Sequence, residues 1–124
     1  MGRDEFENLV ISVVENLPAE FQELLDNVDI VVEDWPSRAQ LKNVGMRNRE
    51  DLLGLYEGTP RTDRGQNYNL VLPDKISIFR KPLEIQCRSR AELRREIAST
   101  VKHEIAHFFG IGDERLDEIE RRRR

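Results

Sequence analysis

Two histidines and one glutamate form the part of the chain best suited to metal chemistry. His103 and His107 lie four residues apart, and Glu104 directly follows the first of them. On an α-helix this spacing places both imidazoles on one face, a single turn apart. Both rings can then bind one Zn²⁺ at about 2.0–2.1 Å, while the carboxylate holds a water molecule at an open position of the metal. The alternative is a surface histidine pair with Glu104 in a salt bridge.

The helix that must position these residues is predicted between Ser89 and Gly110. Ser89 and Glu92 form a capping-box pattern at its start, and Gly110 can adopt the left-handed conformation that ends a helix. One face of this helix collects apolar residues that are predicted to be buried: Leu93, Ile97, Val101, Ile105 and Phe108. Glu104 falls within the same face, where an unpaired carboxylate is costly. A bound metal with its water accounts for that position.

Catalytic zinc sites commonly use three protein ligands, so a third is expected beyond the two histidines. Asp113 is the first candidate, because a chain that leaves the helix through a left-handed Gly110 can fold back across the helix end. The alternative role for Asp113 is the N-cap of the next helix. Further candidate ligands lie in that next helix: Asp117, then Glu114 and Glu118.

The remaining elements are predicted from apolar periodicity, β-branched runs and turn residues. Helices are predicted over 4–16, from 18 onward, over 37–44 and from 114 onward, and strands over 28–34, 51–58 and 75–80. Residues 59–69 are predicted to be a mobile polar loop, and no form is predicted for 82–87. Gly54, inside the second strand, indicates a bulge or a close approach of another backbone. The expected fold is α+β, with a small mixed sheet of three to four strands packed on the long helix and additional helices at both ends.

Length and charge set limits on the class of protein. With 124 residues, the chain is predicted to be a single domain covering 1–124. A net charge of −4 argues against nucleic-acid binding. No apolar run reaches the length of about 18 residues that a membrane helix needs, and the acidic N-terminus is unlike a signal peptide. Cys87 is the only cysteine, which fits a reducing compartment. We therefore predict a soluble cytoplasmic protein without a membrane partner, and the sequence leaves its oligomeric state open.

Residues 103–113 read H-E-x-x-H-x-x-G-x-x-D, and this pattern resembles the extended zinc motif of the metzincins in the variant whose third ligand is aspartate. More closely, the chain resembles the short bacterial minimal zincins. These share an LGLYEG segment, here 53–58, and an LPDxIxIF-R-x-PL segment, here 72–83. The resemblance covers roughly 53–113. The chain departs from the metzincins in having no methionine after Met46, and hence no Met-turn.

The resemblance implies a zincin-like fold with one Zn²⁺ per chain, held by His103, His107 and Asp113. It further implies a zinc-dependent metallopeptidase whose substrate is a peptide or protein. In that mechanism the metal polarises the scissile carbonyl and lowers the pKa of its water to about 7. Glu104 takes the proton of the water and passes it to the leaving amine.

By analogy with zincins, the substrate would lie antiparallel to an edge strand. The strand nominated here is Leu52 to Glu57, with Gly54, Leu55, Tyr56 and Glu57 as the substrate-binding residues. Tyr56 or Tyr68 could stabilise the oxyanion, although a core or loop role is the alternative for both. Two other hypotheses remain for the whole chain. It could be a metal-binding zincin-like module without peptidase activity, acting in partner binding or structure, or a metal-free scaffold whose helix mimics the motif.

Overall fold

The structure, a computed structural model, describes residues 1–58 and 73–123. In chain order its elements are α1 (Arg3–Glu15), α2 (Ala19–Leu24), β1 (Val28–Glu33), α3 (Arg38–Val44), the 3₁₀ turn η1 (Arg49–Asp51), β2 (Gly54–Glu57), β3 (Asp74–Phe79), α4 (Arg80–Gln86), α5 (Arg90–Phe109) and α6 (Asp113–Arg123). The predicted α+β class is confirmed. No described helix is both long enough and apolar enough to cross a membrane.

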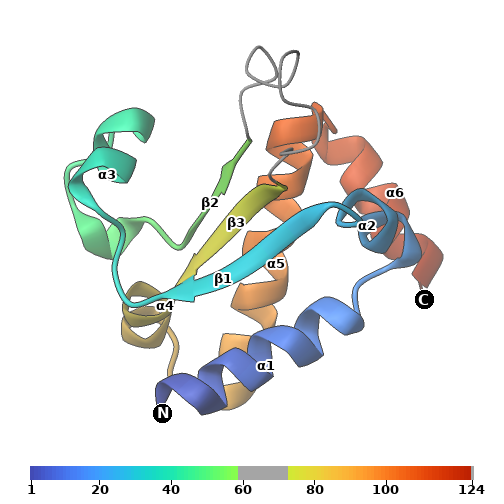
Figure 1. Cartoon of the computed structure of the whole chain (residues 1–124). Helices are drawn as coiled ribbons and strands as arrows, with labels where there is room; N and C mark the ends of the chain where they lie inside the picture. The colour runs from blue at the N-terminus through green and yellow to red at the C-terminus, as the bar shows by residue number, and fades with distance from the viewer. Residues whose placement is uncertain (59–72, 124) are drawn as a thin grey trace.

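The described strands form a mixed sheet in the order β1-β3-β2. β3 is central; β1 runs parallel to it, with Ile30 opposite Ile76, and β2 runs antiparallel to it, with Tyr56 opposite Ile76. Helices α1 and α5 lie on the same side of this sheet (Figure 1). The predicted small mixed sheet on a long helix is therefore present.

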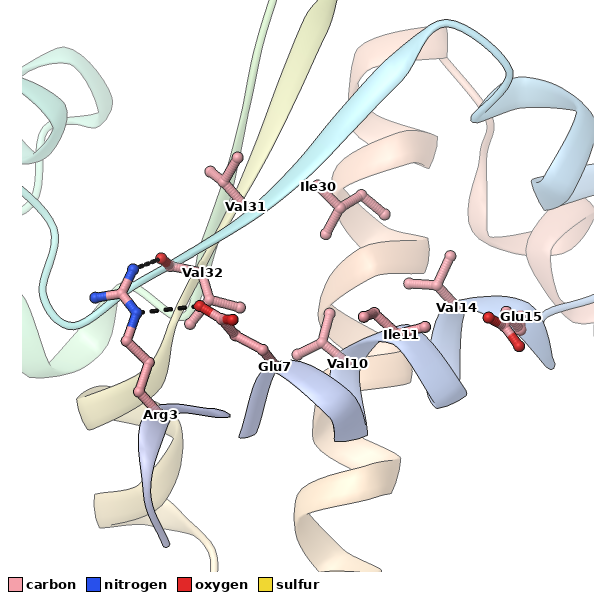
Figure 2. A pocket seen from close by; sticks show the side chains of 9 residues that line it. All are labelled: Arg3, Glu7, Val10, Ile11, Val14, Glu15, Ile30, Val31 and Val32. Carbon is pink, nitrogen blue, oxygen red and sulfur yellow. Dashed lines mark hydrogen bonds and ion pairs between the residues drawn. The ribbon is translucent and has the colours of Figure 1, made fainter. Parts of the chain in front are cut away.

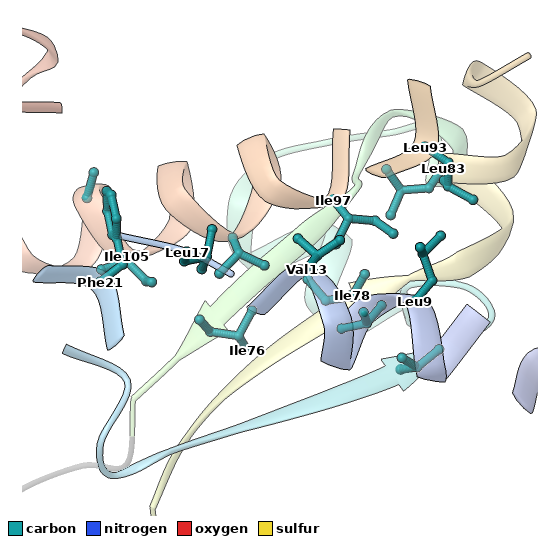
Figure 3. Packing of buried hydrophobic residues seen from close by; sticks show 14 of the residues in the cluster. Leu9, Val13, Leu17, Phe21, Ile76, Ile78, Leu83, Leu93, Ile97 and Ile105 are labelled. Carbon is teal, nitrogen blue, oxygen red and sulfur yellow. The ribbon is translucent and has the colours of Figure 1, made fainter. Parts of the chain in front are cut away.

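The hydrophobic core lies between the sheet and the two helices (Figure 3). Its most deeply buried members include Phe6 and Leu9 of α1, Ile76 and Ile78 of β3, and Ile97, Val101 and Ile105 of α5, and Phe21 of α2 and Leu83 of α4 add to them. The predicted buried face of the long helix is confirmed except at its last member. Phe108 is 46% exposed, because it lies outside the core and its ring stacks instead on Tyr56 of β2, with a centroid distance of 4.0 Å.

The predicted ends of α5 are confirmed. The Ser89 hydroxyl accepts a hydrogen bond from the Glu92 N–H at 3.0 Å, and Gly110 has a φ of 69°. The capping box is only half formed, because the Glu92 carboxylate accepts its bond from the Arg88 N–H at 3.4 Å rather than from Ser89. In α3 the box is complete: the Ser37 and Gln40 side chains each accept a bond from the backbone N–H of the other residue.

Several boundaries differ from the prediction. Arg80, predicted to end the third strand, is the first residue of α4. The predicted strand over 51–58 begins only at Gly54, because 49–51 form a 3₁₀ turn. The segment 82–87, given no predicted form, belongs largely to α4, where Pro82 stands in the first turn and so removes no helical hydrogen bond. The last helix begins at Asp113, one residue earlier than predicted. The predicted loop over 59–69 lies outside the described residues.

Candidate metal centre

His103 and His107 lie one turn apart on α5, and both side chains are exposed. Nδ1 of His103 lies 2.7 Å from the carbonyl oxygen of Ser99 and 3.2 Å from its hydroxyl. A carbonyl can only accept, so we assign the His103 proton to Nδ1. The lone pair of Nε2 is then free for a metal. Zinc-binding histidines are typically oriented in this way, by donating the other ring N–H to a carbonyl or carboxylate.

Glu104 points away from solvent toward β2, as its place on the apolar face predicts. One oxygen of its carboxylate, Oε1, accepts a hydrogen bond from the backbone N–H of Tyr56 at 2.9 Å. Burial raises the pKa of the Glu104 carboxyl above its ordinary value, while the Tyr56 hydrogen bond and the neighbouring histidines act in the opposite direction. A carboxyl with a raised pKa is better suited to take up a proton near neutral pH than an exposed one.

The bond to Glu104 is possible because β2 lies at an edge of the described sheet. The Leu53 carbonyl accepts a bond from the Phe79 N–H at 3.0 Å, so the backbone groups of Leu53 face β3. Backbone groups alternate along a strand, so those of Gly54 and Tyr56 face the outer edge. The outward Tyr56 N–H is the one that Glu104 binds. The strand nominated from the sequence, β2, is thus an edge strand of the described sheet, and it contacts α5, the helix that carries the two histidines.

Gly54 is the residue that lets β2 approach α5 so closely. A Cβ atom at this position would lie 2.5 Å from Cγ2 of Thr100 and 3.2 Å from the Ser77 carbonyl oxygen. Non-bonded carbon atoms do not approach to 2.5 Å, so a larger residue would force the Thr100 side chain, or the backbone of α5 or β2, to move. Of the two predicted explanations for this glycine, close approach is therefore the correct one.

A pocket of about 520 Å³ opens beside Glu104 and His107. Its wall on the β2 side is formed by Leu52, Gly54, Leu55 and Tyr56, and Val44 and Met46 approach it from the end of α3. Val44 and Met46 are absent from the predicted site. They precede the motif by more than fifty residues, and no local pattern marks them. The result is an apolar pocket with a carboxylate and an imidazole in its wall, a composition typical of ligand sites.

The four nominated strand residues are only partly brought together. Gly54, Leu55 and Tyr56 line the pocket, whereas Glu57 is absent from its lining. The Glu57 carboxylate instead accepts a hydrogen bond from the Gln40 side-chain amide at 2.9 Å. The Tyr56 hydroxyl donates to the Asp74 carboxylate at 2.8 Å, and so is already committed to a protein acceptor. Tyr68 lies outside the described residues.

The third metal ligand remains a prediction. Asp113 is the first residue of α6, and the Leu116 N–H donates to the Gly112 carbonyl at 3.1 Å, so Gly112 rather than Asp113 precedes this helix. The side chain of Asp113 is not among those described. Among the described side chains, no three histidines, cysteines or acids are arranged to hold a metal. Of the three predicted ligands, the structure therefore describes the side chains of His103 and His107.

Comparison with protein families identifies the chain. The model of the zincin-like metallopeptidase family matches residues 25–123, which run from just before β1 to α6 and include the whole motif. No curated protein matches the chain in sequence. Zinc binding is general in zincins, and a His103 ring that is oriented through its Nδ1–H fits that chemistry. Because the match spans well over half of the chain and includes both the edge strand and the motif helix, the protein belongs to the zincin-like metallopeptidase family.

Proposed function

We propose that this chain is a zinc-dependent peptidase in which His103, His107 and Asp113 hold one metal ion and Glu104 is the general base. One observation carries the proposal. The carboxylate that stands between the two histidines is half-buried, turned toward the edge strand and held there by the Tyr56 N–H at 2.9 Å. A glutamate on a merely amphipathic surface helix would instead point into solvent.

The donor set suits zinc. Imidazole nitrogens and a carboxylate are ordinary zinc ligands, and three of them leave a position open for water. A bound zinc ion would polarise the scissile carbonyl and make the attacking water more acidic. The Ser99 carbonyl fixes the ring of His103 from the opposite nitrogen, so this ligand is oriented before any metal arrives.

Glu104 performs the proton transfers of the proposed reaction. The Tyr56 N–H engages Oε1, which leaves Oε2 to accept a proton from the attacking water. The water oxygen forms the new bond to the peptide carbonyl carbon, and Glu104 then donates the same proton to the amine as the C–N bond breaks. The raised pKa of Glu104 supports both steps, because the carboxyl must hold the proton between them.

The substrate is proposed to be a peptide or protein segment in extended form. The outward backbone groups of Gly54 can pair with such a segment, as in other cases of strand addition. The pocket beside His107 is lined largely by apolar side chains, among them Val44, Met46 and Leu52. We therefore expect an apolar substrate residue next to the cleaved bond.

A second candidate function is a metal-binding module without peptidase activity. One observation favours it: the outward Tyr56 N–H, which a substrate strand would use, is already bound to Glu104. Substrate pairing at Tyr56 would have to replace that bond. In this case the metal would stabilise the fold or a partner contact rather than take part in hydrolysis.

The replacement Glu104→Gln tests the proposal, because the amide oxygen can still accept the Tyr56 bond while the base is lost. We expect the wild-type protein to bind one zinc per chain and to cleave members of a peptide library that contain apolar residues. Glu104→Gln should retain zinc and lose activity by about 100-fold or more. The matched control is Glu96→Gln, on the same helix two turns earlier, which should behave as wild type.

Zinc content and turnover together separate the hypotheses. Equal cleavage by Glu104→Gln and wild type would show that Glu104 is not the base. Stoichiometric zinc with no turnover on a broad library would establish the module without peptidase activity. If His107→Ala binds as much zinc as wild type, the metal centre itself is wrong.

A further inference from the structure

A groove separate from the candidate metal centre runs between α1 and β1 (Figure 2). Its volume is about 470 Å³, within the range of sites that hold small ligands. Val10, Ile11 and Val14 of α1 form one wall, and Ile30 and Val32 of β1 form the other. β1 and β2 are the two outer strands of the described sheet, so this groove and Glu104 lie at opposite edges.

The outer edge of β1 offers backbone groups for pairing. The Arg3 guanidinium donates to the Val32 carbonyl at this edge, and the Val28 N–H donates to the Leu25 carbonyl at 3.1 Å. Because backbone groups alternate, those of Ile30 face the same edge. Within 1–58 and 73–123, no hydrogen-bond partner is described for Ile30 on this side. A free strand edge of this kind is a template for an added extended segment.

The apolar wall on α1 lies beside that edge. Ile11 is 55% exposed, whereas Val10, one residue before it on α1, is buried at 3% exposure. A single exposed isoleucine needs no explanation by itself. Here, however, Ile11 and Val14 face a strand edge, so the side chains of an added strand would meet them at alternate positions. The groove therefore combines backbone pairing with apolar contact.

The charges at the two ends of the groove differ. At one end Arg3 pairs with Glu7 at 3.1 Å and with Asp34 at 3.8 Å. Asp34 also pairs with Arg80, so each charge at that end has an opposite charge beside it. Glu15 lies at the other end, and no ion pair is described for it within the part of the chain that the structure covers. The chain as a whole carries a net charge of −4. A basic residue is therefore the complementary group at the Glu15 end.

We propose that this groove binds an extended peptide segment of a partner protein. The segment adds a strand at Ile30, places alternate apolar side chains against Ile11 and Val14, and carries a lysine or arginine beside Glu15. The family match begins at residue 25, so the β1 wall lies inside the matched segment and the α1 wall precedes it. The proposal is independent of the metal centre, which lies at the opposite edge of the sheet.

Synthetic peptides of defined charge test the proposal. The probe is a fluorescein-labelled peptide, Lys-Val-Thr-Val-Thr-Val-Lys, and its binding to the full chain is followed by fluorescence anisotropy. A chelator is present throughout, so metal-dependent cleavage cannot consume the probe. We expect this peptide to bind at least tenfold more tightly than the same peptide with glutamate at both ends. Proline at its central valine should weaken binding at least tenfold, because proline cannot donate a backbone hydrogen bond.

Variants of the protein locate the binding site. Ile11→Asn should weaken binding of the basic peptide at least tenfold, and Glu15→Lys should reverse the preference between the two peptides. The matched controls are Ile85→Asn on α4, where the side chain is 61% exposed, and Glu23→Lys on α2. Both controls should bind as wild type does. Thermal melting followed by circular dichroism confirms that every variant is folded.

Three results would overturn the proposal. The first is equal binding of the basic and acidic peptides, and the second is unchanged binding by Ile11→Asn. The third is a concentration-dependent dimer in sedimentation that Ile11→Asn dissociates, since this would assign the groove to a second copy of the chain.

Discussion

Replacing Gly54 by alanine tests the close contact between β2 and α5. The new Cβ would lie 2.5 Å from Cγ2 of Thr100, and Thr100 is itself buried at 9% exposure. Overpacking of this kind costs about 1–3 kcal/mol. Removing a glycine from a strand recovers only about 0.5–1 kcal/mol of backbone entropy. Taking the middle of both ranges, Gly54→Ala should therefore lower the free energy of unfolding by about 1 kcal/mol.

The second substitution Thr100→Ser shows whether that contact is the cause. Serine lacks Cγ2, so it removes the atom that the new Cβ meets. Alone, Thr100→Ser should cost about 1 kcal/mol for one lost methyl group. Combined with Gly54→Ala it should cost less than the sum of the two, because the clash disappears. The Ser77 carbonyl, 3.2 Å from the same Cβ, limits how complete the rescue can be.

Urea unfolding measures both effects, with the fluorescence of the single tryptophan, Trp35, as the signal. All four proteins of the double-mutant cycle are compared at equal m-values, so that midpoint changes report stability. The reasoning fails if Gly54→Ala is as stable as wild type. It also fails if the two substitutions add without coupling, since the predicted contact would then contribute nothing.

Gly110→Ala should cost about 1–2 kcal/mol, because its φ is 69°; a Cβ at this position would meet no atom within 4 Å, so the cost comes from the backbone conformation alone. Gly112 has no positive φ but precedes the first residue of α6, so Gly112→Ala should lower the urea midpoint less than Gly110→Ala does. The hydrogen bond from Arg80 holds the pKa of Asp34 below its ordinary value. The Asp34 carboxylate therefore stabilises the fold above about pH 4, and this stabilisation is lost as the pH falls through the folded-state pKa. Asp34→Asn should accordingly unfold at a lower urea midpoint than wild type at pH 7, and the two midpoints should converge in acid. If the proposed metal centre is correct, a chelator should lower the melting temperature of the zinc-loaded protein. When the free zinc concentration is about 100 times its Kd, removing the metal should lower the free energy of unfolding by about 2.7 kcal/mol. His107→Ala should show no such change.

The ends of several elements could be read from the sequence, because the interactions that form them span only a few residues. Ser37 with Gln40, Ser89 with Glu92, and Gly110 each act within one turn of helix. The spacing of His103 and His107 likewise determines that they share a face of α5, since the helix repeat alone sets it. The same repeat places Glu104 on the inward side of that helix, among the apolar residues.

Other features arise only when distant segments meet. Phe108 lies outside the core and stacks on Tyr56, which comes from β2. α4 escaped prediction because its seven residues contain too few turns for a clear apolar period.

The candidate site shows the same division between local and long-range effects. The motif identified Glu104, but the atom that holds its carboxylate is the backbone N–H of Tyr56, forty-eight residues earlier in the chain. Backbone groups are alike in every residue except proline, so no sequence pattern marks the one that will face a given side chain. The sequence by itself determined which side chains could carry the chemistry and on which side of their helix they stand. Only the tertiary structure decided what they face, because that depends on how the strand edge and the helix pack against each other.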